Sequence, residues 1–267
     1  MHPENCVTAL FEWLWRDYTA RLCPSAARIH QLLEEDAPLI NDHIALRTFD
    51  LDPVGLETLA RPFLALGYEP GGDYLFNAKK LVAKHYEHSD PTLPKVFISE
   101  LKVQECSESL QAIVAKLIAQ IEVDKLNGAE FLYAGRLWSL SYRDYQQLAQ
   151  ESEYAAWLAA HGYGANHFTV NVNQLKRFGE VSEVNQHLID AGFIINQAGG
   201  EVKGSPDVLL EQSSTMADKV MVAFDEGQFE IPGGFYEFAK RYPTLSGGLY
   251  SGFVAASADK IFESTDR

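Results

Sequence analysis

Apolar and polar residues alternate along two short segments of the chain, and a histidine stands near the start of each. Residues 41–49 (NDHIALRTF) predict a strand that carries His43 and Arg47 on one face. Residues 166–173 (NHFTVNVN) alternate in the same way and place His167 on one face of a second predicted strand. Two segments with this shared pattern suggest an internal repeat.

Each of these strands is followed by the pattern of a helix and then of further strands. In the first unit, the pattern predicts a helix over residues 53–66, a turn at Gly71-Gly72 and strands within 74–87 and 95–103. The distance from His43 to the glycine that ends the helix is 24 residues.

The second unit repeats this order. Apolar residues between 175 and 189 recur near helical spacing and predict a helix, and strand-like runs follow at 208–212, 219–224 and around 235–238. The histidine of this unit precedes the glycine that ends its helix by 25 residues, which matches the first unit closely. The chain therefore contains two predicted βαβββ units.

These units predict an α+β fold in which two paired βαβββ modules form a curved sheet around a metal cavity, within a single domain. An N-terminal helical segment and a helical insertion between the modules complete the pattern. In the insertion, apolar residues between 110 and 121 follow helical spacing, and Ser141 with Asp144 predicts a capping box. The expected parts, in chain order, are residues 1–40, 41–104, 105–163, 164–242 and 243–267.

Composition and charge restrict the class of protein. The chain has 267 residues, of which 46% are hydrophobic, and a formal net charge of −15, which argues against nucleic acid or an anionic membrane as partner. Three widely spaced cysteines form no CxxC pair, and the N-terminal segment resembles neither a signal peptide nor a membrane span. We therefore expect a cytoplasmic protein.

The two histidines are the first candidates for chemistry. A lone histidine in a strand is usually structural, but two at equivalent positions of paired units would enter one cavity. Two imidazoles and one carboxylate form the facial set of ligands found in non-haem Fe(II) oxygenases.

Glu100 and Glu237 compete for the place of the third ligand. They stand on late strands of their units, 57 and 70 residues after the histidines, so we expect them to be counterparts in the repeat. Glu237 lies in an aromatic run (FYEF), which favours burial, and a buried carboxylate needs a metal, a cation or a proton. His85 and His88 could also bind a metal, but the repeat does not support them, and we expect surface or supporting positions for both.

Arg47 is the cation of greatest interest. It shares the predicted face of His43 and follows it by four residues, roughly 13 Å along a strand. A guanidinium in that place could hold a substrate carboxylate through two hydrogen bonds, or it could form an ordinary surface salt bridge.

Six segments together resemble the 2-oxoadipate dioxygenase/decarboxylase family, whose members are also called D-2-hydroxyglutarate synthases. The segments are DHIALRTF, FISEL, NHFTVNV, LLEQSSTMAD, GGFYEFAKR and ADKIFEST. The fold of that family is similar to the vicinal-oxygen-chelate superfamily, which agrees with the paired units. Well-studied members are longer at the C-terminal end, and this difference bears on the substrate more than on the metal.

The resemblance implies Fe(II) bound by His43, His167 and Glu237, with Arg47 in contact with a substrate carboxylate. The implied reaction consumes O2 and converts the 2-oxo acid 2-oxoadipate into 2-hydroxyglutarate and CO2, a step of lysine catabolism. A homodimer is one candidate assembly.

Two rival functions stay open from the sequence. One is a glyoxalase-like metal-dependent isomerase or lyase with Glu100 as a fourth ligand. The other is a non-catalytic module of the same fold that binds a small molecule.

Overall fold

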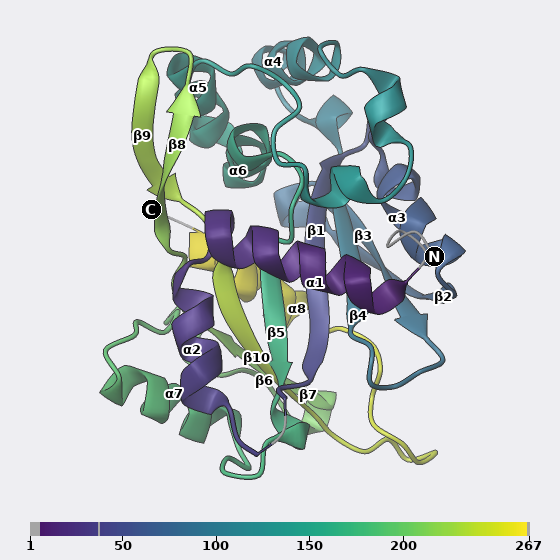
Figure 1. The fold of residues 1–267 in the computed structure, drawn as a ribbon, viewed down its shortest axis with the longest axis vertical. Helices are drawn as coiled ribbons and strands as arrows, with labels where there is room; N and C mark the ends of the chain where they lie inside the picture. The colour runs from purple at the N-terminus through teal and green to yellow at the C-terminus, as the bar shows by residue number, and fades with distance from the viewer. Residues whose placement is uncertain (1–5, 37, 266–267) are drawn as a thin grey trace.

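The computed structural model describes residues 6–36 and 38–265, so the predictions for positions 1–5, 37 and 266–267 lie outside it. The strands are β1 (Asn41–Phe49), β2 (Tyr68–Phe76), β3 (Leu81–His88), β4 (Lys95–Leu101), β5 (His167–Asn171), β6 (Lys203–Ser205), β7 (Leu210–Ser214), β8 (Lys219–Phe224), β9 (Gly227–Pro232) and β10 (Phe235–Arg241). Within the described ranges, eight of them form one sheet in the order β2-β3-β4-β1-β5-β10-β7-β6, and β8 pairs with β9 in a separate hairpin (Figure 1).

The sheet consists of two similar halves that meet at its centre. β1 pairs with β4 in parallel and β5 pairs with β10 in parallel, while β1 and β5 run antiparallel to each other. Each half also contributes a helix after its first strand, α3 (Leu56–Ala65) or α7 (Val181–Asp190). The predicted pair of βαβββ modules is confirmed, with the β8–β9 hairpin inserted before the last strand of the second module.

Several predicted boundaries of the first module are wrong. Gly71 and Gly72 lie inside β2, beside an irregularity in its pairing with β3, and do not form a turn. The start of β2 was not predicted from the sequence, because this strand lies at the edge of the sheet. Most of its side chains are at least partly exposed there and show no apolar alternation. α3 begins at Leu56 with Gly55 as its N-cap, three residues later than predicted.

The second module also departs from its predicted pattern. Residues 175 and 178 precede α7, which begins only at Val181. Its N-terminus has a capping box formed by Glu180, the N-cap residue, and Glu183 in the first turn. The short strand β6 and the hairpin strand β9 were not predicted, and β8 lies outside the main sheet. In β8, alternate residues are exposed because the hairpin is not covered on both faces.

The remaining helices are α1 (Val7–Asp17), α2 (Ser25–Leu33), α4 (Glu108–Ile118), α5 (Tyr142–Glu151), α6 (Glu153–His161) and α8 (Ala255–Phe262). The predicted N-terminal helical segment forms α1 and α2, and the apolar stripe of α4 is buried as predicted. The side chain of Ser141 accepts a hydrogen bond from the amide of Asp144, which caps α5.

The two faces of the sheet have different coverings. On one face, α1 crosses the central strands (Figure 1). Trp15 and Tyr18, at the end of α1 and just after it, pack there against Phe168 of β5 and Tyr236 of β10. Because side chains alternate along a strand, their neighbours in sequence, including His167, point to the opposite face. There α8 packs against β2, β6 and β7, and thus against both edge strands of the curled sheet.

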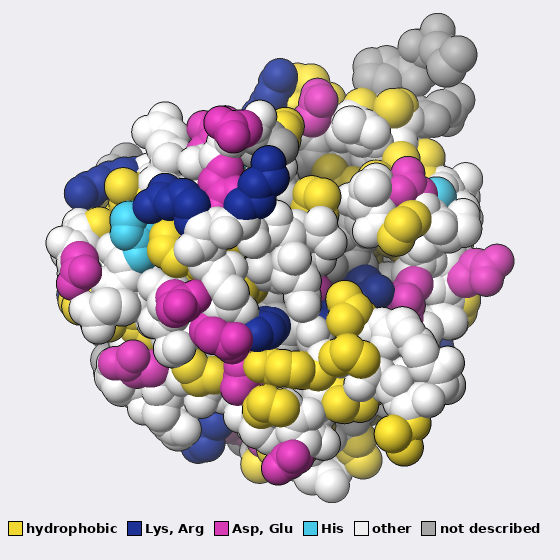
Figure 2. Space-filling model, turned by 90° about the horizontal axis from the view of Figure 1, so that it is seen from below, with side chains coloured by type: hydrophobic (Ala, Val, Ile, Leu, Met, Phe, Trp, Pro, Cys, Tyr) yellow, Lys and Arg dark blue, Asp and Glu magenta, His cyan; other side chains and the backbone are white. Residues whose placement is uncertain are grey.

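The surface carries charges of both signs. Figure 2 shows one face, on which Lys and Arg side chains lie among Asp and Glu side chains. Among the helices described, none combines the length and apolar character needed to cross a bilayer. Cys6, Cys23 and Cys106 are free thiols.

Candidate metal centre

Three potential metal ligands lie together on neighbouring strands: His43 on β1, His167 on β5 and Glu237 on β10. Nε2 of His167 lies 3.4 Å from Nε2 of His43 and 3.0 Å from Oε2 of Glu237. All three side chains are buried, and one ligand atom from each lies within 4.8 Å of the other two. The structure thus brings together the three residues that the sequence singled out.

The register of the strands explains this meeting. β1 and β5 pair with Ile44 opposite Phe168, so a twofold rotation about that pair exchanges His43 with His167. Glu237 pairs with the β5 residue that lies two positions beyond His167, and therefore points to the same face.

The same rotation identifies the counterpart of Glu237 in the first module. This counterpart is not Glu100, so the prediction that the two glutamates occupy equivalent positions is wrong. Phe97 pairs with the β1 residue two positions beyond His43, so Phe97 occupies the equivalent place. The carboxylate of Glu100 instead accepts a hydrogen bond of 2.7 Å from the amide of Leu56, at the start of α3. An apolar ring at the fourth position leaves three ligands in the cavity.

Each histidine is oriented by the residue directly before it. Nδ1 of His43 donates to the Asp42 carboxylate at 2.7 Å, and Nδ1 of His167 donates to the side-chain oxygen of Asn166 at 3.1 Å. Both rings therefore turn Nε2 toward the shared point, an arrangement typical of metal-binding histidines. These partners were not predicted, although an oxygen-bearing residue directly precedes each repeated histidine in the sequence (DH and NH).

The protonation of Glu237 and His167 suits a cation, whereas His43 favours a proton that a bound metal would displace. Burial raises the pKa of Glu237, but the two imidazoles and the amide of Gln212 outweigh it and hold that pKa below its ordinary value. Burial lowers the pKa of His167 to about 3, so this ring is neutral. Burial also lowers the pKa of His43, but Glu237 and Asp42 outweigh it and raise the pKa above its usual value.

The residues present fit a divalent metal. Within residues 6–36 and 38–265, Oε2 of Glu237 is buried and has no hydrogen-bond donor. An ionised carboxylate in that condition is costly unless a cation lies beside it. Two imidazole nitrogens and a carboxylate oxygen form a donor set that zinc, iron and related metals accept.

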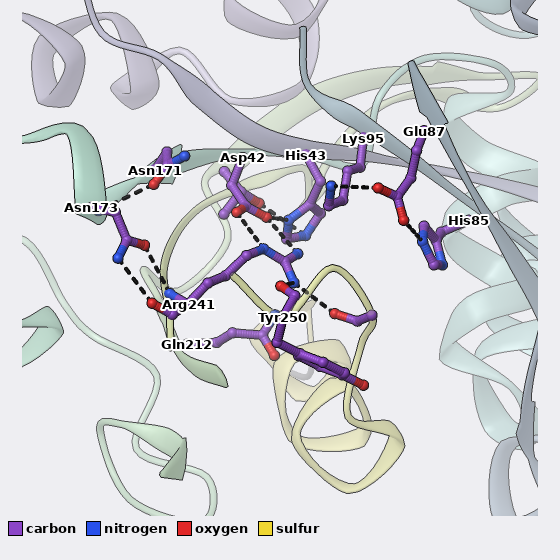
Figure 3. A network of polar contacts seen from close by, with 12 residues as sticks. Asp42, His43, His85, Glu87, Lys95, Asn171, Asn173, Gln212, Arg241 and Tyr250 are labelled. Carbon is purple, nitrogen blue, oxygen red and sulfur yellow. Dashed lines mark hydrogen bonds and ion pairs between the residues drawn. The ribbon is translucent and has the colours of Figure 1, made fainter. Parts of the chain in front are cut away.

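Arg241 connects the centre to the C-terminal segment (Figure 3). Its Nε and Nη2 donate to the two oxygens of Asp42 at 2.6 and 2.8 Å, and Nη1 donates to the carbonyls of Tyr250 and Gly252. Phe253 follows directly, and its ring stands edge-on to His43 with centroids 4.8 Å apart. One buried arginine thus supports the Asp42–His43 pair and fixes the segment that covers it.

The cavity beside the ligands is small because α8 and Phe253 pack over the concave face of the sheet, next to the ligands. Its lining includes the three ligands, Gln212, Phe97, Phe253, Ala258, Ile261 and Phe262. The free volume is about 20 Å³, enough for about one water molecule.

Arg47 is buried on β1, and its guanidinium has partners from two elements. Nη1 lies 3.2 Å from the carboxylate of Glu153, and the group stacks on the rings of Tyr154 and Trp157. It also lies 5.7 Å from the ring centroid of Phe262, which lines the metal cavity. Arg47 is therefore not a surface residue, and it adjoins α8 through Phe262, which also lines the cavity.

His85 does not lie on the surface, contrary to one of the two expectations for it. Nε2 of His85 donates to Glu87, its Nδ1 accepts from the hydroxyl of Tyr74, and the ring lies 5.3 Å from that of Phe253. His85 thus supports the wall of the cavity. His88 accepts a hydrogen bond from the amide of Asp90 and does not belong to the ligand group.

The sequence and structure match known proteins over most of their length. Residues 10–247 match the 2-oxoadipate dioxygenase/decarboxylase family. A protein of Oryza sativa subsp. japonica named 2-oxoadipate dioxygenase/decarboxylase (chloroplastic/amyloplastic) is 37% identical over 271 positions, which cover 91% of this chain and 74% of the relative.

Two solved structures superpose closely on this chain. The hydroxyglutarate synthase from Oryza sativa, in complex with 2-oxoadipate, has a TM-score of 0.88 at 34% identity, covering 96% of this chain and 90% of that one. A protein from Shewanella frigidimarina NCIMB 400, whose name suggests a hydrolase, has a TM-score of 0.91 at 57% identity, covering 94% and 99%.

Proposed function

Because this chain belongs to the 2-oxoadipate dioxygenase/decarboxylase family, we propose that it is a metal-dependent dioxygenase acting on a 2-oxo dicarboxylic acid. The proposed reaction converts 2-oxoadipate and O2 into 2-hydroxyglutarate and CO2. The first carboxylate leaves as CO2, one oxygen atom of O2 completes the new carboxylate, and the other becomes the hydroxyl group.

The observation that carries the proposal is the buried group of His43, His167 and Glu237 with Phe97 at the fourth position. We propose Fe(II) as the resident metal, since two imidazoles and one carboxylate are the facial set used by non-haem Fe(II) oxygenases. Bound iron would supply chelation of the 2-oxo acid and redox chemistry with O2. The chain supplies the orientation of the ligands through Asp42 and Asn166, and a largely apolar wall that keeps bulk water out of the cavity.

Arg47 is proposed to hold the distal carboxylate of the substrate. Its position on the His43 strand, its burial and its contact with the cavity-lining Phe262 support this role. The guanidinium pairs with Glu153 of α6, and α8 leaves only about 20 Å³ beside the ligands, so α8 must move before a substrate can reach both Arg47 and the metal.

The rival functions receive less support. A four-ligand isomerase needs Glu100 at the metal, yet that carboxylate bonds the start of α3. A passive binding module has no need for two histidines oriented by Asp42 and Asn166. A hydrolase could use the same metal ligands, so the oxygen requirement has to be measured.

A cytoplasmic location, a homodimer and a step in lysine catabolism are further proposals. The free thiols of the described cysteines are compatible with a reducing compartment. Size-exclusion chromatography with light scattering would report the oligomeric state.

Reconstitution tests the function. The purified protein is loaded with Fe(II) under anaerobic conditions, and O2 uptake and CO2 release are then followed with 2-oxo acids of four to seven carbons. We expect one O2 consumed and one CO2 released per 2-hydroxy acid formed, with 2-oxoadipate preferred. Turnover of any of these acids without O2 would favour a hydrolase or isomerase instead.

A further inference from the structure

Gln212 is a buried polar residue in the wall of the metal cavity. It belongs to β7, is 2% exposed, and lines the same cavity as His43, His167 and Glu237. No feature of the sequence distinguished it, because a single glutamine in a strand gives no pattern.

The amide nitrogen of Gln212 has a defined partner. Nε2 donates to Oε1 of Glu237 at 2.5 Å, and this oxygen lies 3.7 Å from Nε2 of His43. The other oxygen, Oε2, faces Nε2 of His167 at 3.0 Å. Gln212 therefore selects which oxygen of Glu237 is presented to a metal.

The carbonyl oxygen of Gln212 is left without a partner. In the part of the chain that the structure describes, no donor reaches this buried atom. Turning the amide over would bring its oxygen against the Glu237 carboxylate, so the observed orientation is the favourable one. The other neighbours in the wall, such as Phe97, Phe253 and Ile261, are apolar and cannot donate.

A buried acceptor without a donor is unusual in a native protein and costs free energy. The missing donor must therefore come from a molecule inside the cavity. A 2-oxo dicarboxylate brings only acceptors, since its keto and ionised carboxylate oxygens carry no hydrogen. Water and the hydroxyl group of a 2-hydroxy acid are donors.

We propose that Gln212 is a positioning residue with two roles: its amide orients Glu237 toward the metal, and its carbonyl accepts a hydrogen bond from a hydroxyl group held in the cavity. The second role favours water or the 2-hydroxy acid over the 2-oxo acid. This part rests on the proposed function, whereas the role toward Glu237 does not.

Gln212→Met removes both hydrogen bonds while keeping an unbranched side chain of similar length. Ser213→Ala is the matched control, because Ser213 is the next residue on β7, is equally buried, and donates to Asn185 rather than facing the cavity. Both proteins are compared with the wild type for thermal unfolding, for Mn²⁺ affinity by chelator competition, and, loaded with Mn²⁺ without O2, for binding of 2-hydroxyglutarate and 2-oxoadipate.

We expect Gln212→Met to weaken Mn²⁺ binding by about 10- to 100-fold, as loss of an outer hydrogen bond to a ligand typically does. Binding of 2-hydroxyglutarate should weaken by about tenfold relative to 2-oxoadipate. Ser213→Ala should change neither value. Unchanged Mn²⁺ affinity in Gln212→Met would overturn the first role, and an equal loss for both acids would overturn the second. If the wild type bound neither acid, the proposed substrate would fail, while the metal measurement would still decide the first role.

Discussion

Arg47 shows how one buried side chain can serve either structure or substrate binding. Its guanidinium has the carboxylate of Glu153 as a partner, yet Nε has no hydrogen-bond acceptor within the described chain. A buried N–H donor without an acceptor can form one more hydrogen bond. A substrate carboxylate would accept it in the bidentate geometry that a planar guanidinium prefers.

Replacing Arg47 with Met should lower kcat/KM for 2-oxoadipate by about 30-fold or more, since loss of a desolvated charge pair costs about 2–5 kcal/mol. Metal content should not change. Arg47→Lys should rescue only part of the loss, because an ammonium group lacks the planar fork. Steady-state kinetics with O2 detection measure both effects.

Glu153→Gln is the control, because it removes the internal partner and leaves the guanidinium in place. If Arg47 binds substrate, this variant should keep or improve the KM for 2-oxoadipate. Wild-type kinetics of Arg47→Met on every dicarboxylate tested would make Arg47 a purely structural residue.

Glu100 provides the second test at this scale. Glu100→Gln should retain full metal content, because the amide oxygen of Gln can still accept the hydrogen bond from Leu56 that the carboxylate accepts now. Metal analysis of the purified variant measures this. Loss of the metal to the extent seen on replacing Glu237 would support the four-ligand isomerase.

At the scale of elements, the sequence predicted the central strands and missed the edges. β1 and β5 alternate because one face of each packs in the apolar core and the other carries polar residues toward the metal cavity, whereas β2 and β6 lie at edges where exposed residues interrupt the pattern. The register of the strands could not be predicted from the sequence, because it depends on pairing between segments that are far apart along the chain. For that reason Glu100, and not Phe97, was predicted as the counterpart of Glu237 in the repeat.

The position of α8 over the metal cavity could not be predicted from the sequence either, because it arises only from the packing of this helix on the folded sheet. A free volume of about 20 Å³ cannot admit a six-carbon acid, so α8 and the segment with Phe253 must move during turnover. Amide hydrogen exchange on the metal-loaded protein without O2 should show faster exchange in α8 than in α6, a buried helix, and a change on adding 2-oxoadipate confined to α8 and its surroundings. Equal protection of both helices, unaffected by bound substrate, would contradict this movement.

For the whole molecule, the net charge of −15 opposes the approach of a dianionic substrate, so we propose that capture depends on local cations such as Arg47. Stability should depend on pH through histidines that are buried in the neutral form. His161 is one of them: its Nε2 donates to the carbonyl of Pro232 at 2.8 Å, and burial, assisted by nearby arginines, lowers its pKa to about 3.

Between about pH 6.5 and pH 3 the unfolded chain binds a proton at His161 and the folded chain does not. The stability that this group contributes is therefore present above pH 6.5 and is lost as the pH falls toward 3. In His161→Asn the dependence of the unfolding free energy on pH should be shallower in this window, by up to about 1.4 kcal/mol per pH unit. Urea unfolding at several pH values measures the slope, and slopes equal to those of the wild type would show that His161 titrates normally in the folded protein.

The metal content of single variants tests whether His43, His167 and Glu237 form one metal centre. His43→Ala, His167→Ala and Glu237→Ala are purified beside the wild type and Glu100→Gln, reconstituted with Fe(II) under anaerobic conditions and desalted, and the iron is measured per chain, with circular dichroism as a check on the fold. We expect about one iron per chain in the wild type and in Glu100→Gln, and near-complete loss in each of the three ligand variants with the fold retained. Full iron content in all three ligand variants would contradict a metal centre formed by His43, His167 and Glu237.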